Sequence, residues 1–135
     1  MTVRGRWAVT ACAVAVVAVL AFLFWPRPAQ PVEMTGQAGD HRVRLLVGSP
    51  AVGLQDLTLE VAGTVDRLVV APTMVEMGHA SAPVTATPVA PGRFAAQDVE
   101  FFMPGRWDVT VTVYGPEGSD DVVLPVLIAA RGRES

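Results

Sequence analysis

Apolar and polar residues alternate with a period of two through most of the chain from residue 40 onward. Over residues 107–113, one apolar residue follows every polar one, so that one face of the segment is apolar and the other mostly polar. This pattern is typical of a half-buried β-strand, and residues 57–61 repeat it. The same criteria predict further strands over 41–47, 66–71, 83–88, 92–102 (bent) and 121–129.

Clusters of Gly, Pro and Ser separate these segments, and no segment after residue 26 keeps an uninterrupted helical period. About seven short strands with regularly spaced turns indicate an all-β domain, an antiparallel β-sandwich of the immunoglobulin type. Pro125 has no backbone N–H to donate, so the last strand is expected at a sheet edge or at a bulge.

The strongest departure from this pattern is the run 7–25, which contains no charged side chain. As a helix its nineteen residues would extend about 28 Å, close to the thickness of the bilayer's hydrocarbon core. Trp7 and Trp25 flank it, as expected where aromatic rings meet the membrane interface. The sequence therefore predicts one N-terminal transmembrane signal-anchor helix.

Two arginines, Arg4 and Arg6, precede the run, so the positive-inside rule places the N-terminus in the cytoplasm and the domain outside the cell membrane. A cleaved signal peptide is the alternative, but its apolar region is usually shorter, and Arg27 would lie at −3 for cleavage after Ala29. A lipoprotein is disfavoured because Cys12 lies near the start of the run. Each alternative leaves the domain extracytoplasmic.

These features divide the chain into five expected parts. They are a cytoplasmic tail (1–6), the anchor helix (7–25), a Pro-rich extended spacer (26–39), the sandwich domain (40–130) and a C-terminal tail (131–135).

Charge and motifs exclude several classes of function. The 135-residue chain carries ten Arg and no Lys against thirteen acidic residues, a net charge of −3, which is unsuited to nucleic acid. One cysteine builds neither a disulfide framework nor a cysteine zinc site. Hydrolase, zinc-protease and phosphate-loop motifs are absent, so we expect no enzyme, no catalytic residue and no small-molecule substrate.

Residues 72–80 fit the strand pattern poorly and gather potential soft-metal ligands. Met74, Met77 and His79 lie within six residues, Gly78 allows the backbone to bend between them, and Met103 follows at a later turn. Thioether sulfur is a soft, neutral ligand, and together with imidazole it favours copper, Cu(I) more than Cu(II). The residues alone leave a second interpretation open, because methionine also fills irregular gaps in protein cores.

Other notable residues are assigned structural roles. Trp107 heads the alternating apolar face and is expected in the core, and Gly105 is expected at a turn with positive φ. Met34 and His41 are expected in disordered or surface positions.

The chain from His41 to Val113 resembles the YtkA-like domain family on several stretches of sequence. Three of them carry the resemblance: residues 52–61 (VGLQDLTLEV), 74–79 (MVEMGH) and 103–111 (MPGRWDVTV), with Pro91-Gly92-Arg93-Phe94 between the last two. The family pattern usually has Pro at the position of Val75 and Tyr at that of Phe94, and the turn at residues 63–65 is shorter here.

The resemblance implies an extracytoplasmic immunoglobulin-like module related to FixH-like and copper-handling proteins. It supports a membrane-anchored copper-binding protein that holds or transfers the metal in copper homeostasis or oxidase assembly. Met74, Met77, His79 and Met103 are the expected ligands, and a membrane transporter or an oxidase is the expected partner. The alternative is a β-sandwich that contacts a membrane partner without metal.

Overall fold

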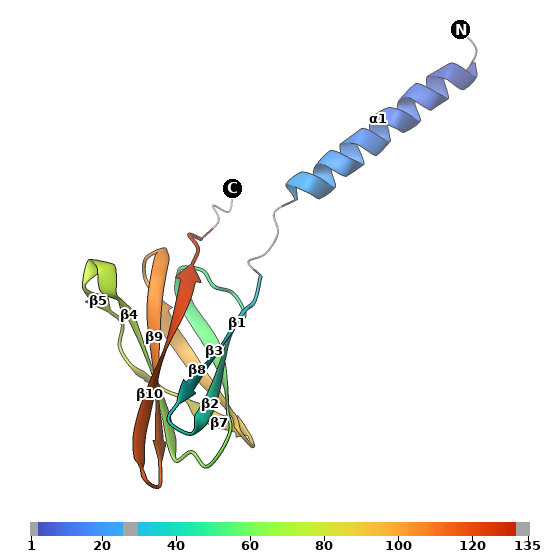
Figure 1. Ribbon diagram of the computed structural model, residues 1–135. Helices are drawn as coiled ribbons and strands as arrows, with labels where there is room; N and C mark the ends of the chain where they lie inside the picture. The colour runs from blue at the N-terminus through green and yellow to red at the C-terminus, as the bar shows by residue number, and fades with distance from the viewer. Residues whose placement is uncertain (1–2, 26–29, 132–135) are drawn as a thin grey trace.

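A computed structural model describes residues 3–25 and 30–131 of the chain. It consists of an N-terminal helix followed by a β domain (Figure 1). The helix is α1 (Val3–Phe24). The strands and the 3-10 turn are β1 (Val32–Ala38), β2 (His41–Val47), β3 (Gly53–Val61), β4 (Arg67–Met74), η1 (Val75–Met77), β5 (His79–Ala80), β6 (Val84–Thr85), β7 (Thr87–Ala90), β8 (Arg93–Phe101), β9 (Gly105–Gly115) and β10 (Gly118–Ile128).

The described strands form two antiparallel sheets packed as a sandwich, which confirms the predicted fold class. The first sheet has the order β1-β2-β3-β8-β7 and the second the order β10-β9-β4-β5, with β6 pairing beside β4. The predicted strand 41–47 coincides with β2, and the segment 83–88 divides into β6 and β7. β10 lies at a sheet edge, where Pro125 is tolerated.

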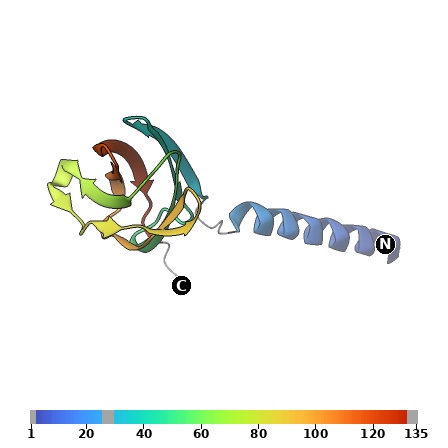
Figure 2. The ribbon, with the colours of Figure 1, turned by 90° about the horizontal axis from the view of Figure 1, so that it is seen from below.

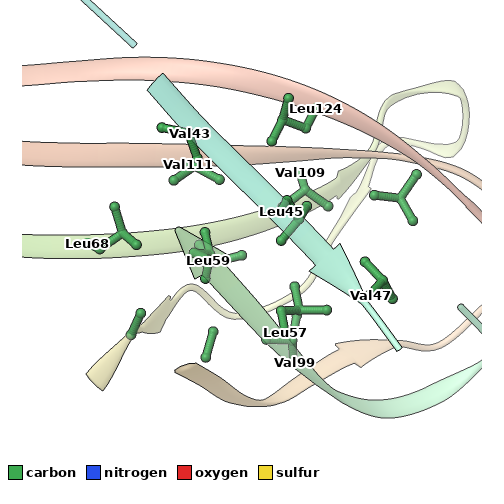
Figure 3. Packing of buried hydrophobic residues seen from close by; sticks show 14 of the residues in the cluster. Val43, Leu45, Val47, Leu57, Leu59, Leu68, Val99, Val109, Val111 and Leu124 are labelled. Atoms are coloured by element: carbon green, nitrogen blue, oxygen red, sulfur yellow. The ribbon is translucent and has the colours of Figure 1, made fainter. Parts of the chain in front are cut away.

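Alternate residues of both sheets build a single apolar core. Figure 3 shows Val43, Leu45 and Val47 of β2 facing side chains of the opposite sheet. Trp107 and Phe101 are the largest fully buried side chains. The core therefore follows from the period of two in the sequence, and the predicted core position of Trp107 is confirmed.

The N-terminal helix is long and apolar enough to cross a membrane, a property shared by membrane anchors and signal sequences. Its span Gly5–Phe24 has a mean hydropathy of 2.5, and none of it is buried against the rest of the protein. The helix begins at Val3 rather than Trp7, so part of the predicted tail 1–6 is helical. Residues 1–2 of that tail and 132–135 of the predicted C-terminal tail lie outside the described residues.

The spacer predicted over 26–39 is wrong from Val32 onward, because Val32–Ala38 forms strand β1 of the sandwich. Residues 26–29 of the predicted spacer lie outside the described part. β1 pairs along its whole length with β2, from Val32 opposite Val47 to Ala38 opposite His41. Its inward positions include Gly36, which gives no apolar signal, and this explains why the alternation was missed.

Gly36 allows β1 to pass close to β10, where the edges of the two sheets meet (Figure 2). A Cβ atom at Gly36 would lie 2.5 Å from Cγ2 of Val122 and 2.9 Å from Cδ2 of Leu124. Met34, two residues earlier, packs partly buried against the core, which contradicts the expected disordered or surface role.

Salt bridges cross four adjacent strands on the outer face of the first sheet. Arg44 of β2 contacts Glu33 of β1 at 2.6 Å and Glu60 of β3 at 2.9 Å, and Arg93 of β8 contacts Glu60 at 2.8 Å. The hydrogen bond from Arg44 lowers the pKa of the Glu33 carboxyl, and those from Arg93 and then Arg44 lower the pKa of Glu60. The ionised carboxylates thus help to attach β1 to the sheet.

Strand registers define the two ends of the sandwich. The chain enters at Val32, opposite Val47, and the strand ends Gly53, Phe101, Gly105 and Ile128 lie at the same end of the sandwich. We call this the entry end. The opposite end, with the β1–β2 turn at Gly39 and the β9–β10 turn after Gly115, is called the far end.

We expect Gly36→Ala to destabilise the domain relative to Gly48→Ala. Both substitutions restrict the unfolded chain equally, but only Gly36 lies against neighbouring side chains, whereas nothing lies within 4 Å of a Cβ at Gly48. The overpacking cost is about 1–3 kcal/mol. Urea unfolding of the full chain in detergent measures it, and equal midpoints for the two variants would contradict the close β1–β10 contact.

Stability should also fall on acidification. Folding lowers the pKa of Glu33 and Glu60 below their ordinary value of 4.5. Their ionised carboxylates therefore contribute fully to the stability of the fold above pH 4.5, and this contribution is lost as the carboxylates bind protons at lower pH. We expect the free energy of unfolding to decrease from about pH 5 to about pH 3. Arg44→Gln should flatten this dependence, whereas Arg42→Gln, on the same strand, should leave it unchanged.

Candidate metal centre at the entry end

Met74, Met77 and His79 belong to one tight hairpin at the entry end. β4 carries Met74 as its last residue, η1 ends at Met77, and β5 begins at His79. Gly78 adopts a left-handed conformation, φ 66° and ψ 25°, and its N–H bonds to the carbonyl of Val75 at 3.2 Å. The predicted bend between sulfur and imidazole is therefore confirmed, and it reverses the chain so that Met74 and His79 are cross-strand partners.

Met103 lies in the turn between β8 and β9, which a partly buried hydrogen bond holds in place. The indole Nε1–H of Trp107 donates to the Met103 carbonyl at 2.9 Å. Gly105, two residues further on, has a φ of 130°, a region that favours glycine, as predicted. The register of Gly105 with Ile128 places this turn at the entry end.

Two contacts join the hairpin to this turn, and a third supports them from within the core. The His79 ring packs edge-on against Phe102 with 5.8 Å between ring centroids, and Phe102 packs in the same way on Trp107 at 5.0 Å. Cε of Met74 lies 3.0 Å from the position of a Cβ on Gly105. The hairpin and the turn, 24 residues apart from His79 to Met103, are thus brought together at the mouth between the two sheets.

The four predicted ligands differ in exposure. Met77 is 54 % exposed and His79 is also exposed, whereas Met103 is partly buried and packs against the core. Met74 is only 4 % exposed because it continues the inward face of β4. Directly opposed residues of an antiparallel pair share a face, so His79 projects on the same side as Met74, nearer to solvent.

Ser81 fastens the hairpin to the opposite sheet. Its hydroxyl donates to the carbonyl of Glu100 in β8 at 2.6 Å, and its N–H bonds to the carbonyl of Pro72 in β4 at 3.0 Å. Ser81 is the buried polar residue among the core positions. These two hydrogen bonds keep the hairpin, and with it His79, next to Phe102.

His41 does not join the candidate site. It lies at the far end, where its Nε2 is 3.1 Å from the carbonyl oxygen of Thr64. Met34 is also separate, since it packs on β1 in the first sheet. Neither residue was among the predicted ligands.

The surroundings of the hairpin carry both signs of charge. Glu76 of η1 lines a cavity of about 220 Å³ with Arg106 and Asp108, on the outer side of the second sheet. Within residues 3–25 and 30–131, no group of three or more His, Cys, Asp or Glu side chains could hold a metal ion. A metal site formed by the four predicted ligands would therefore depend mainly on thioether sulfur.

Sequence analysis missed Phe102 and Ser81. The pair Phe101-Phe102 interrupts the alternation at the end of its strand, which was a usable signal that one of the two rings is turned outward. Ser81 gave no signal, because its role depends on a contact with a strand nineteen residues away.

Comparisons of the chain with protein-family models, curated proteins and solved structures found no match in any of the three.

Alanine substitutions should separate the structural from the exposed methionines. Met74→Ala removes a buried side chain and should cost about 2–5 kcal/mol of unfolding free energy. Met77→Ala changes an exposed residue and should stay within about 0.5 kcal/mol of the original protein. Thermal or urea unfolding without metal measures both, and a Met77 effect as large as that of Met74 would contradict the burial difference.

Proposed function

We propose that this protein is a membrane-anchored, extracytoplasmic copper-binding module of the YtkA-like type, without catalytic activity. It holds or transfers Cu(I) through Met74, Met77, His79 and Met103, in copper homeostasis or oxidase assembly. α1 remains uncleaved as a single-pass anchor, with the N-terminus in the cytoplasm and the sandwich outside. The resemblance in sequence and the arginines before the helix support the family and the orientation.

The observation that carries the proposal is the convergence of the two Met-bearing segments. The hairpin and the β8–β9 turn meet through the His79–Phe102 and Met74–Gly105 contacts, although the sequence separates them. Three thioethers and one imidazole suit a soft, singly charged metal ion far better than a hard cation. The neutral sulfurs need no deprotonation, so binding to them releases no protons and adds only the single positive charge of Cu(I) to this end of the sandwich.

Because the four predicted ligands differ in solvent exposure, we expect each to contribute differently to copper binding. Met77 and His79 are accessible and would meet the incoming ion first. The hydrogen bond from Trp107 to the Met103 carbonyl holds the backbone of Met103 in place. Met74 would contribute from beneath, after a rotation of its flexible thioether arm.

Copper competition tests the proposal. The full chain, purified in detergent under reducing conditions, should withdraw about one equivalent of Cu(I) from a chromogenic chelator. The triple substitution Met77→Leu, His79→Gln and Met103→Leu should abolish this competition while keeping the core intact. Met34→Leu, which removes a thioether elsewhere in the sandwich, should bind as the original protein does.

Equal competition by the original protein and the triple variant would contradict the proposed site. Failure of the original protein to compete at all would favour the alternative function, a β-sandwich that contacts a membrane partner without metal.

A further inference from the structure

Exposed apolar side chains of the sandwich are concentrated at the entry end. Among its described residues, seven large hydrophobic side chains are exposed, and five of them lie at or next to this end. These five are Leu54, Val75, Met77, Phe102 and Leu127, with exposed fractions of 61, 66, 54, 36 and 73 %.

The five side chains surround the end rather than belonging to one strand. Leu54 is the second residue of β3 in the first sheet and Phe102 follows β8, whereas Leu127 is the last residue but one of β10 in the second sheet. Val75 and Met77 form the projecting turn η1. The two remaining exposed residues lie elsewhere, Val89 on β7 and Val123 nearer the middle of β10. We call the five exposed side chains at the entry end the apolar rim.

The same end receives the chain from α1. Seven residues, 25–31, separate Phe24 at the end of the helix from Val32 at the start of β1. Such a segment spans at most about 25 Å even when fully extended. β9 alone, with eleven residues, extends about 37 Å, so the far end lies much further from the helix than the entry end does.

We propose that the entry end rests on the lipid bilayer that holds α1, with the apolar rim in contact with the interfacial region. This inference depends on the anchoring part of the proposed function and is independent of copper. The short connection keeps the rim at high local concentration beside the lipid surface, which makes even a weak apolar contact effective. Large hydrophobic side chains partition favourably into that region.

The contact is expected to be apolar rather than electrostatic. Among residues 3–25 and 30–131, charges of both signs lie near the rim: Glu76 of η1, Arg106 of β9, and Arg131 beside Gly53. A bilayer of zwitterionic phosphatidylcholine should therefore suffice, and moderate salt should have little effect.

Fluorescence quenching in vesicles tests the contact with the full chain. In a Cys12→Ala background, the substitutions Leu127→Cys and Val123→Cys each carry a fluorophore on the same exposed face of β10. A second pair compares Leu54→Cys with Ser119→Cys at the far end. With nitroxide-labelled phosphatidylcholine, we expect quenching severalfold stronger at residues 127 and 54 than at 123 and 119.

The native Cys12, labelled in the otherwise unchanged chain, reports on the anchor itself. Quenching at Cys12 together with equal quenching within each pair would overturn the lipid contact and leave the anchor intact. No quenching at Cys12 would overturn both the anchor and the contact. Selective quenching that arises only in native membranes, and not in pure lipid, would overturn the lipid contact in favour of a protein partner.

Discussion

Trp107 and its partly buried hydrogen bond determine how the entry end is built. An indole N–H taken into a core must find an acceptor, and here it donates to the carbonyl of Met103 at 2.9 Å. The bond fixes the turn before β9, while the ring packs edge-on against Phe101 and Phe102. Phe102 in turn supports the His79 ring. The orientation of the candidate ligands thus depends on a residue that is itself fully buried.

The pairing of β4 with β9 supplies the second constraint. Thr73 opposite Asp108 brings the end of β4 level with the start of β9, and Met74 then reaches beneath Gly105. A side chain at Gly105 would meet the Met74 methyl group and would also strain a backbone with φ of 130°. Met74 and His79 are therefore presented by strand ends, which hold them more firmly than a long loop would.

The same end combines two proposed properties, an apolar rim and a soft-metal site. Met77 belongs to both, since it is exposed on η1 and is a predicted ligand. If the rim rests on lipid, copper would enter and leave the site at the membrane surface. A membrane-embedded transporter or oxidase would be suitably placed for that exchange, in agreement with the partner class expected from the sequence.

The sequence predicted most of the sandwich because its alternation is strong. β2 was predicted residue for residue, and the position of Trp107 in the core followed from the pattern of β9. β1 was missed because its inward face includes Gly36, whose lack of a side chain is required by Val122.

The site was predicted less completely. Met74 lies beyond the strand predicted over 66–71, in the segment 72–80 that fits the strand pattern poorly. β4 in fact continues through Pro72, which falls between the residues paired with β6 and those paired with β5. The role of Phe102 depends on its contacts with His79 and Trp107, and contacts between separate segments cannot be predicted from the local sequence pattern.

The most informative measurement is NMR of the full chain with carbon-13 in the methionine methyl groups, titrated with Cu(I). We expect the methyl signals of Met74, Met77 and Met103 to shift together and to saturate at one equivalent, while that of Met34 does not move. Shifts of Met77 alone, or equal shifts at Met34, would contradict a single site formed by the hairpin and the β8–β9 turn.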